Sequence, residues 1–401
     1  MPGARRAPVL VAVLIAALAA CGGRSIPAPA APTPADTPSP RSAAPAPAPA
    51  DPAAACVRQT LDGLDTRERA AQLIMAGVPA DGLTGAGRTA LTQGVGGVIL
   101  TDAAGGEASA AQVTATTRAV QRAAQVPVTV ATDQEGGKVQ DLKGAGFTRI
   151  PSATAQGRDV AGLRGDAEGW GREMSAAGVT LDLAPVADVV DPALGESNEP
   201  VGALDRGFGT DPRRVGQAVT AFVEGLDAGG VDATLKHFPG LGRVRENTDF
   251  AGAADSRTGV DDPGLASFRA GLAAGAPVVM MSSAVYERID PDNRALFSRA
   301  VVTDLLRGRL GFDGVVTTDD VGAARAVADV PVGERAVRFV EAGGDQVLTI
   351  EPSDVEPMVD ALVREADDPA FAERVTESAR RILALKAARG VLTCQGSPTG
   401  G

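Results

Sequence analysis

The chain contains one histidine, His237, and it lies where an apolar segment gives way to a glycine-containing loop. Lys236 stands directly beside this imidazole. A second apolar segment ends in two adjacent carboxylates, Asp319 and Asp320, and a third is followed by Asp133. Carboxylates and an imidazole can act as nucleophiles and as general acids and bases. These residue types predict an enzyme active site if the fold brings the three segments together.

The segments that must position these residues have the character of buried parallel strands, and they alternate with segments of helical periodicity. In the stretch from 211 to 226, Asp211 can cap a helix, Pro212 suits its first turn, and Gly229-Gly230 can end it. Residues 371–390 have the pattern of a closing helix. The expected strands cover residues 73–77, 95–100, 126–132, 179–185, 231–237, 278–282, 314–318 and 345–350.

Eight such alternations predict an α/β fold, a single (β/α)8 TIM-type barrel. The alternative is a doubly wound parallel sheet, and it is weakened because no Gly-x-Gly-x-x-Gly follows the first strand. In a barrel the polar residues at the strand ends converge on one mouth, and apolar walls would strengthen their electrostatic interactions.

The N-terminal residues have the pattern of an export signal. Arg5 and Arg6 precede an apolar stretch, 9–20, that is too short to span a bilayer, and Cys21 follows at once. We expect a lipoprotein signal over residues 1–21, with Cys21 as the lipidated residue; the alternative is an ordinary secretory signal. Lipidation would anchor the protein to the outer face of the cell membrane.

The domain organisation follows from composition. Residues 22–55 are rich in Pro and Ala and predict a disordered tether. Residues 56–395 form the predicted barrel, and 396–401 a disordered tail. Cys56 and Cys394 bracket the barrel, and in an oxidising exterior such a pair predicts a disulfide; two free thiols are the alternative.

The composition also limits the partners. One histidine and two distant cysteines offer no metal-ligand cluster, so no metal site is expected. The formal net charge of −12 argues against nucleic acid as a partner. With few aromatic residues (3%), a compact pocket for a small ligand is easier to build than a long stacking platform. We expect a monomer that touches the membrane through its lipid anchor alone.

The motifs at the strand ends resemble those of glycoside hydrolase family 3. They resemble in particular its single-domain bacterial β-N-acetylglucosaminidases, and the lipobox, tether and flanking cysteines resemble the actinobacterial lipoprotein members. The resemblance covers residues 66–386. The motifs that carry it are Asp133-Gln134-Glu135-Gly136-Gly137, Gly146-Phe147-Thr148-Arg149, Ala184-Pro185-Val186-Ala187-Asp188-Val189, Lys236-His237-Phe238-Pro239-Gly240 and Gly311-Phe312-Asp313-Gly314-Val315-Val316-Thr317-Thr318-Asp319-Asp320.

The resemblance implies a role for each matched residue. Asp133, Arg206, Lys236 and His237 would bind the hydroxyl groups of one sugar ring. Asp319 would be the nucleophile of a retaining mechanism, which proceeds through a covalent glycosyl-enzyme intermediate. The preference for Asp319 over Asp320 rests on the resemblance alone. No cofactor is implied, because glycosyl transfer to water uses carboxylates.

The loop after Gly240 departs from the family pattern. The family has an Asp-His pair there as general acid/base, whereas this chain has Asn247 and Asp249. A substrate-binding arginine of the family is replaced by Asp141. Asp249 or the nearby Glu246 could serve as acid/base with a pKa raised by burial. Otherwise the enzyme would be slow, relying on water or an activated leaving group, or the site would be silent.

The sequence thus predicts a surface-anchored glycoside hydrolase acting on terminal β-linked sugars, such as β-N-acetylglucosaminides from muropeptide-type cell-wall fragments. One alternative is a catalytically silent sugar-binding lipoprotein on the same fold. Another is a Schiff-base aldolase that uses Lys236, because a lysine that ends a barrel strand can be desolvated and made nucleophilic.

Overall fold

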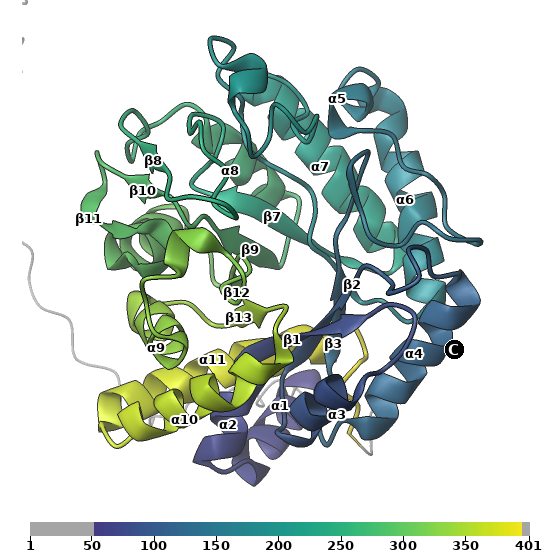
Figure 1. Cartoon of the computed structure of the whole chain (residues 1–401), viewed down its shortest axis with the longest axis vertical. Coiled ribbons are helices and arrows are strands. Elements are labelled where there is room, and N and C mark those ends of the chain that lie inside the picture. The colour runs from purple at the N-terminus through teal and green to yellow at the C-terminus, as the bar shows by residue number, and fades with distance from the viewer. Residues whose placement is uncertain (1–51, 395–401) are drawn as a thin grey trace, which may run out of the picture. The chain divides into compact units, whose positions relative to one another are not determined.

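The computed structural model describes residues 52–394, which fold into a barrel of eight parallel strands (Figure 1). All eight predicted strands are present, in the order β12-β9-β7-β6-β3-β2-β1-β13. The predicted TIM-type fold is therefore confirmed. The strands are β1 Ile74–Pro79, β2 Gly97–Thr101, β3 Thr129–Thr132, β6 Leu181–Asp182, β7 Asp232–Phe238, β9 Val278–Met281, β12 Val315–Thr318 and β13 Val347–Thr349.

The barrel closes between β12 and β13. Thr317 pairs in parallel with Gln346, and the Thr318 amide donates to the Gln346 carbonyl at 3.0 Å. The Thr318 hydroxyl also accepts a hydrogen bond from the Leu348 amide at 2.9 Å. These bonds satisfy backbone groups that an open sheet would leave at an edge. They also place the end of β12, where Asp319 follows, beside the end of β13.

Helices surround the strands (Figure 1), and short additional strands lie in the loops at the mouth. The additional strands are β4 Gln134–Gly136, β5 Val139–Gln140, β8 Ala254–Asp255, β10 Val285–Tyr286 and β11 Asp290–Arg294. The helices are α1 Pro52–Gly63, α2 Thr66–Gln72, α3 Gly85–Thr92, α4 Ala110–Ala123, α5 Ala153–Gln156, α6 Val160–Ala176, α7 Pro212–Gly229, α8 Leu265–Ala273, the π-helical segment Ala300–Arg309, α9 Val332–Ala342, α10 Val355–Glu365 and α11 Pro369–Ala388.

The helix expected from residue 211 onward is α7. The Asp211 carboxylate accepts from the amides of Arg213 and Arg214, and Pro212 occupies the first helical position. Gly230 ends the helix in the left-handed conformation, with φ 87°, which a residue without a Cβ adopts at low cost. The predicted signals at both ends of this helix are confirmed.

Helix α11 is the predicted closing helix, and it crosses the barrel at the end where the strands begin. Arg374 and Arg381 of α11 bind the fully buried Asp345, which precedes β13. Directly after the last residue of α11, Arg389 binds Asp232, the first residue of β7, at 2.7 Å. One helix therefore links the beginnings of strands on different sides of the barrel and closes this end.

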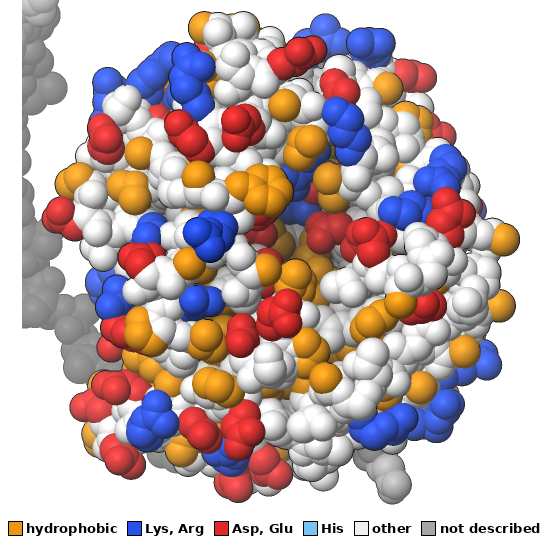
Figure 2. All heavy atoms as spheres, in the orientation of Figure 1, with side chains coloured by type: hydrophobic (Ala, Val, Ile, Leu, Met, Phe, Trp, Pro, Cys, Tyr) orange, Lys and Arg blue, Asp and Glu red, His pale blue; other side chains and the backbone are white. Residues whose placement is uncertain are grey.

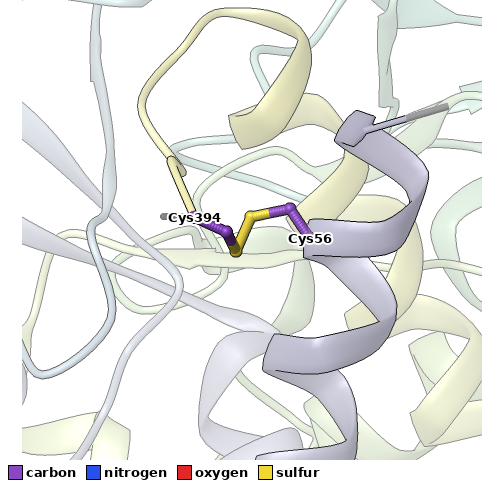
Figure 3. The surroundings of a disulfide bond; sticks show 2 residues. All are labelled: Cys56 and Cys394. Carbon is purple, nitrogen blue, oxygen red and sulfur yellow. A yellow bond between two sulfur atoms is a disulfide. The ribbon is translucent and has the colours of Figure 1, made fainter. Parts of the chain in front are cut away.

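The predicted disulfide is confirmed. Cys56 in α1 and Cys394, which follows α11, are bonded, with their Cα atoms 5.5 Å apart (Figure 3). The bond joins positions that are 338 residues apart in the chain. Helix α1 begins at Pro52, inside the segment predicted as tether. A proline in the first helical turn followed by three alanines favours this earlier start.

Several predicted features lie outside the described residues. They are the signal segment with Cys21, the tether before Pro52 and the C-terminal tail. Within residues 52–394, no helix has the length and apolar character needed to cross a membrane. In the same range, no group of three or more His, Cys, Asp or Glu side chains could hold a metal ion.

Lys386 in α11 is buried, and its ammonium donates to the Gln72 side chain at 2.7 Å. Burial lowers the pKa of Lys386 from 10.5 to about 7. Between pH 7 and pH 10.5 the unfolded chain binds more protons than the folded chain, so the free energy of unfolding rises with pH. The cost of burying the Lys386 ammonium is therefore largest at or below neutral pH. We expect Lys386→Met to stabilise the protein by on the order of 1–4 kcal/mol at pH 6.

Thermal unfolding at pH 6 and pH 9 measures this effect, and the gain should shrink at the higher pH. Substitution of the exposed Lys138 by Met is the control and should change the melting temperature little at either pH. A Lys386→Met protein that melts below the wild type at pH 6 would contradict the assigned cost of burying this ammonium.

Candidate active site

A cavity of about 590 Å³ opens at the ends of the barrel strands. Figure 2 shows a hollow near the middle of this face, bordered by acidic and hydrophobic side chains. The structure brings all six residues predicted for catalysis and sugar binding to this one cavity, although they come from five separate segments of the chain. They are Asp133, Arg206, Lys236, His237, Asp249 and Asp319.

A network of alternating charges forms one wall of the cavity. The Lys236 ammonium lies 2.5 Å from Asp133 and 2.6 Å from Glu135. Arg206 binds the two Glu135 oxygens at 2.9 and 2.7 Å, a bidentate pair. Burial alone would raise the pKa of Glu135, but Arg206 and Lys236 outweigh it and lower this pKa to about 2. Glu135 thus stays ionised and fixes the two cations.

Lys236 remains a charged lysine in this setting. Its burial would lower its pKa, but the carboxylates of Asp133 and Glu135 outweigh that effect and raise the pKa above its ordinary value. A Schiff base requires a neutral amine, so the aldolase alternative does not fit the site. Asp133 is only partly buried, and its other oxygen can accept from a ligand hydroxyl.

His237 is held in place by Asp188, a fully buried residue. The Asp188 carboxylate lies 2.8 Å from His237 Nδ1 and accepts from the backbone amides of His237 and Leu241. The other ring nitrogen, Nε2, therefore points toward Arg206, at 3.4 Å, and toward Asp319, at 4.0 Å. Asp188 is part of a motif quoted above, but sequence reasoning gave it no role, and the same holds for Glu135.

The structure distinguishes the two adjacent carboxylates that end β12. Both oxygens of Asp320 are used by backbone amides: Oδ1 accepts from Gly322 and Ile350, and Oδ2 from Ala323. Asp320 therefore holds the loop in shape. Asp319 Oδ1 accepts one bond, from the Asp320 amide, while Oδ2 faces His237. Of the two, Asp319 has the oxygen that is available to a ligand.

The charge on Asp319 is disfavoured by its surroundings. Burial is the largest cause, and the nearby Asp249 carboxylate adds to it, so the pKa of Asp319 is raised. His237, Lys236 and the Asp320 amide act in the opposite direction and reduce the shift. A desolvated carboxylate next to hydrogen-bond donors is a common arrangement at reactive sites.

The loop that departs from the family pattern is fastened over the cavity. The Asn247 side chain accepts from the Asp249 amide at 3.0 Å. The Asp249 carbonyl accepts from the Arg325 amide, and the Thr248 carbonyl from the Ala326 amide, each at 3.1 Å. These bonds join the loop after β7 to the loop after β12, so Asp249 and Asp319 face the same cavity.

Two other residues considered from the sequence, Glu246 and Asp141, do not line the main cavity. Glu246 lines a separate surface hollow beside Arg294 and Asp329, so it is not placed to act on a ligand in the main cavity. Asp141 lies behind Asp133, with its amide donating to the Asp133 carbonyl at 2.9 Å. Burial, Asp133 and Asp102 together raise the pKa of Asp141 to about 8.

Comparisons with known proteins agree with this geometry. The model of the glycosyl hydrolase family 3 N-terminal domain matches residues 65–385. A β-hexosaminidase of Xanthomonas oryzae is 36% identical over 268 residues, which is 63% of this chain and 76% of the relative. A second β-hexosaminidase, from Stenotrophomonas maltophilia, is 38% identical over 266 residues, covering 64% of this chain and 76% of that protein.

Solved structures are similar as well. The β-N-acetylhexosaminidase of Beutenbergia cavernae is 45% identical with a TM-score of 0.78, and the match covers 82% of this chain and 99% of that one. A family 3 β-N-acetylglucosaminidase from a Paenibacillus species is 31% identical with a TM-score of 0.73, covering 84% of this chain and 65% of the other. The chain therefore belongs to glycosyl hydrolase family 3 and is a glycoside hydrolase.

Proposed function

We propose that the protein removes terminal β-linked N-acetylglucosamine by a retaining mechanism, with Asp319 as nucleophile and Asp249 as general acid/base. The observation that carries the proposal is the Oδ2 of Asp319, which faces His237 and lies in one cavity with Asp249 and the hydrogen-bonding groups of Asp133, Arg206, Lys236 and His237. The choice of sugar is supported by similarity to proteins described as β-N-acetylhexosaminidases and β-N-acetylglucosaminidases.

In the first step, Asp319 Oδ2 attacks the anomeric carbon, and the bond from that carbon to the leaving oxygen breaks. Protonated Asp249 gives its proton to this oxygen. The resulting glycosyl ester is hydrolysed by a water molecule that Asp249, now ionised, deprotonates, so the sugar leaves with net retention. His237 and Lys236 lie on the side of Asp319 where they can stabilise its carboxylate.

The substrate test assays a protein that comprises residues 52–401 and retains the disulfide. Its two substrates are 4-nitrophenyl β-N-acetylglucosaminide and 4-nitrophenyl β-glucoside. We expect release of nitrophenol mainly from the first. Failure to cleave either glycoside, together with calorimetric binding of N-acetylglucosamine, would reject the hydrolase proposal. It would favour the silent sugar-binding protein instead.

Asp249 also has a predicted effect on pH dependence. Because its charge raises the pKa of Asp319, Asp249→Asn should lower that pKa. Activity is lost as pH falls and Asp319 becomes protonated, so the acid limb of kcat/KM should move to lower pH. A β-glycosyl fluoride is the substrate for this measurement, because fluoride departs without a general acid.

Glu246→Gln provides a control that removes the same charge from the same loop outside the cavity. It should leave the acid limb where it is in the wild type. The predicted charge coupling would be contradicted by an unchanged acid limb in Asp249→Asn. On phenyl β-N-acetylglucosaminide, whose leaving group needs protonation, Asp249→Asn should lower kcat/KM by on the order of 10²-fold.

We also propose that the protein is exported and anchored to the outer face of the membrane through Cys21. The support is sequence alone: Arg5 and Arg6, the apolar stretch 9–20 and the cysteine that follows it. Metabolic labelling with an alkyne fatty acid in a bacterial expression host should mark the wild type. The label should be absent from Cys21→Ser; equal labelling of the two proteins would refute the anchor.

A further inference from the structure

Most of the exposed large hydrophobic side chains in the described residues lie at the rim of the active-site cavity. Three large hydrophobic side chains are exposed among the described residues: Phe250 (77%), Val260 (37%) and Ile350 (37%). Two of the three, Phe250 and Ile350, line the cavity that contains Asp319, and Val260 does not. Apolar surface gathered at a binding cavity is typical of a ligand-contacting region.

Phe250 is exposed although its backbone is held in a defined turn. The Asn247 carbonyl accepts from the amides of both Phe250 and Ala251 at 3.0 Å. The preceding residue, Asp249, is fastened to Arg325 of the neighbouring loop. The aromatic ring is thus presented by a well-bonded segment and is not covered by the rest of the described chain.

The position of Phe250 relative to the catalytic groups indicates which part of a substrate it meets. The charged network of Asp133, Glu135, Arg206 and Lys236 is largely buried and suits the hydroxyl groups of the sugar that is transferred. Asp249 must reach the oxygen between that sugar and the leaving group. Phe250 follows Asp249 directly, and both residues are exposed, unlike the largely buried charged network, so Phe250 lies on the leaving-group side.

We propose that Phe250 is the platform for the leaving group, and that the enzyme prefers leaving groups with a flat apolar face. Such a face is offered by an aryl ring and by the carbon–hydrogen side of a pyranose ring, both of which pack on aromatic side chains. Ile350, on the same rim, contributes further apolar surface. The proposal rests on the proposed hydrolase function and adds the specificity of its leaving-group site.

The test compares kcat/KM for three substrates with the same N-acetylglucosaminyl group: phenyl glycoside, the β-1,4 disaccharide of N-acetylglucosamine, and the β-glycosyl fluoride. Phe250→Ala should lower kcat/KM about tenfold for each of the first two. It should leave the fluoride unchanged, because fluoride has no ring to contact. Phe250→Trp should retain the wild-type values on all three substrates.

Val260→Ala is the matched control, since it shortens an exposed apolar side chain outside the cavity. It should behave as the wild type. If Phe250→Ala lowers kcat/KM for the phenyl glycoside alone, Phe250 contacts aryl leaving groups. If it lowers kcat/KM for the disaccharide alone, Phe250 contacts sugar leaving groups. Equal loss on all three substrates, or no loss on any, would overturn the assignment of Phe250. A wild type that cleaves none of them would instead reject the proposed function.

Discussion

Asp319→Asn should reduce hydrolysis of aryl β-N-acetylglucosaminides by at least about 10³-fold, because loss of a covalent nucleophile removes the intermediate itself. An amide oxygen carries too little negative charge to form the glycosyl ester. Asp320 cannot substitute, because its two oxygens already accept three backbone hydrogen bonds. Steady-state rates with 4-nitrophenyl β-N-acetylglucosaminide measure this loss.

Two further measurements separate a lost nucleophile from a damaged fold. Burial disfavours the charge on Asp319, so the neutral Asn variant should melt at or above the wild-type temperature. A mechanism-based fluorosugar should label Asp319 of the wild type, as shown by peptide mass spectrometry. Turnover that survives in Asp319→Asn, or a label on another carboxylate, would refute the assignment.

Replacement of Cys56 and Cys394 by serine should destabilise the protein by about 5 kcal/mol, among the largest losses expected from any change outside the cavity. The bond closes a segment of 338 residues, and cross-linking so long a segment strongly restricts the unfolded chain. Unfolding in urea, with and without reductant, measures the difference. Activity at low temperature should be kept, because the bond lies at the end of the barrel away from the cavity.

Reduced wild type is the internal control, and it should unfold at the same urea concentration as the double serine variant. The variant itself should not respond to reductant. If its free energy of unfolding lies within about 1 kcal/mol of the oxidised wild type, the chain-entropy argument does not hold for this barrel.

The sequence was sufficient to predict the barrel because each strand is a separate apolar segment and each is bounded by turn or helix signals. The differences are at the element ends. The stretch predicted as a strand over 179–185 is a regular strand, β6, only at Leu181–Asp182, and parallel pairing resumes as an isolated bridge between Val186 and Lys236. Pro185 lacks an amide hydrogen and cannot continue a central strand in the regular pattern.

The site was predictable as a set of strand ends but not as a network. Glu135 and Arg206 are 71 residues apart, and Asp188 and His237 are 49 apart, so their pairing depends on the closed barrel. The sequence also could not separate Asp319 from Asp320 or Asp249 from Glu246. In each case hydrogen bonds or loop placement in the folded chain decide which carboxylate is available to a ligand in the cavity.

Helix α11 and the disulfide also determine where the protein can be attached to a solid support without blocking access to the cavity. Both ends of the described chain are tied to the closed floor of the barrel, because Arg389 reaches the first residue of β7 and Cys394 lies a few residues farther on. A bead or sensor chip coupled next to residue 52 or residue 394 would leave the opposite face directed into solution. Enzyme immobilised in this way should be as accessible to dissolved glycosides as enzyme that diffuses freely.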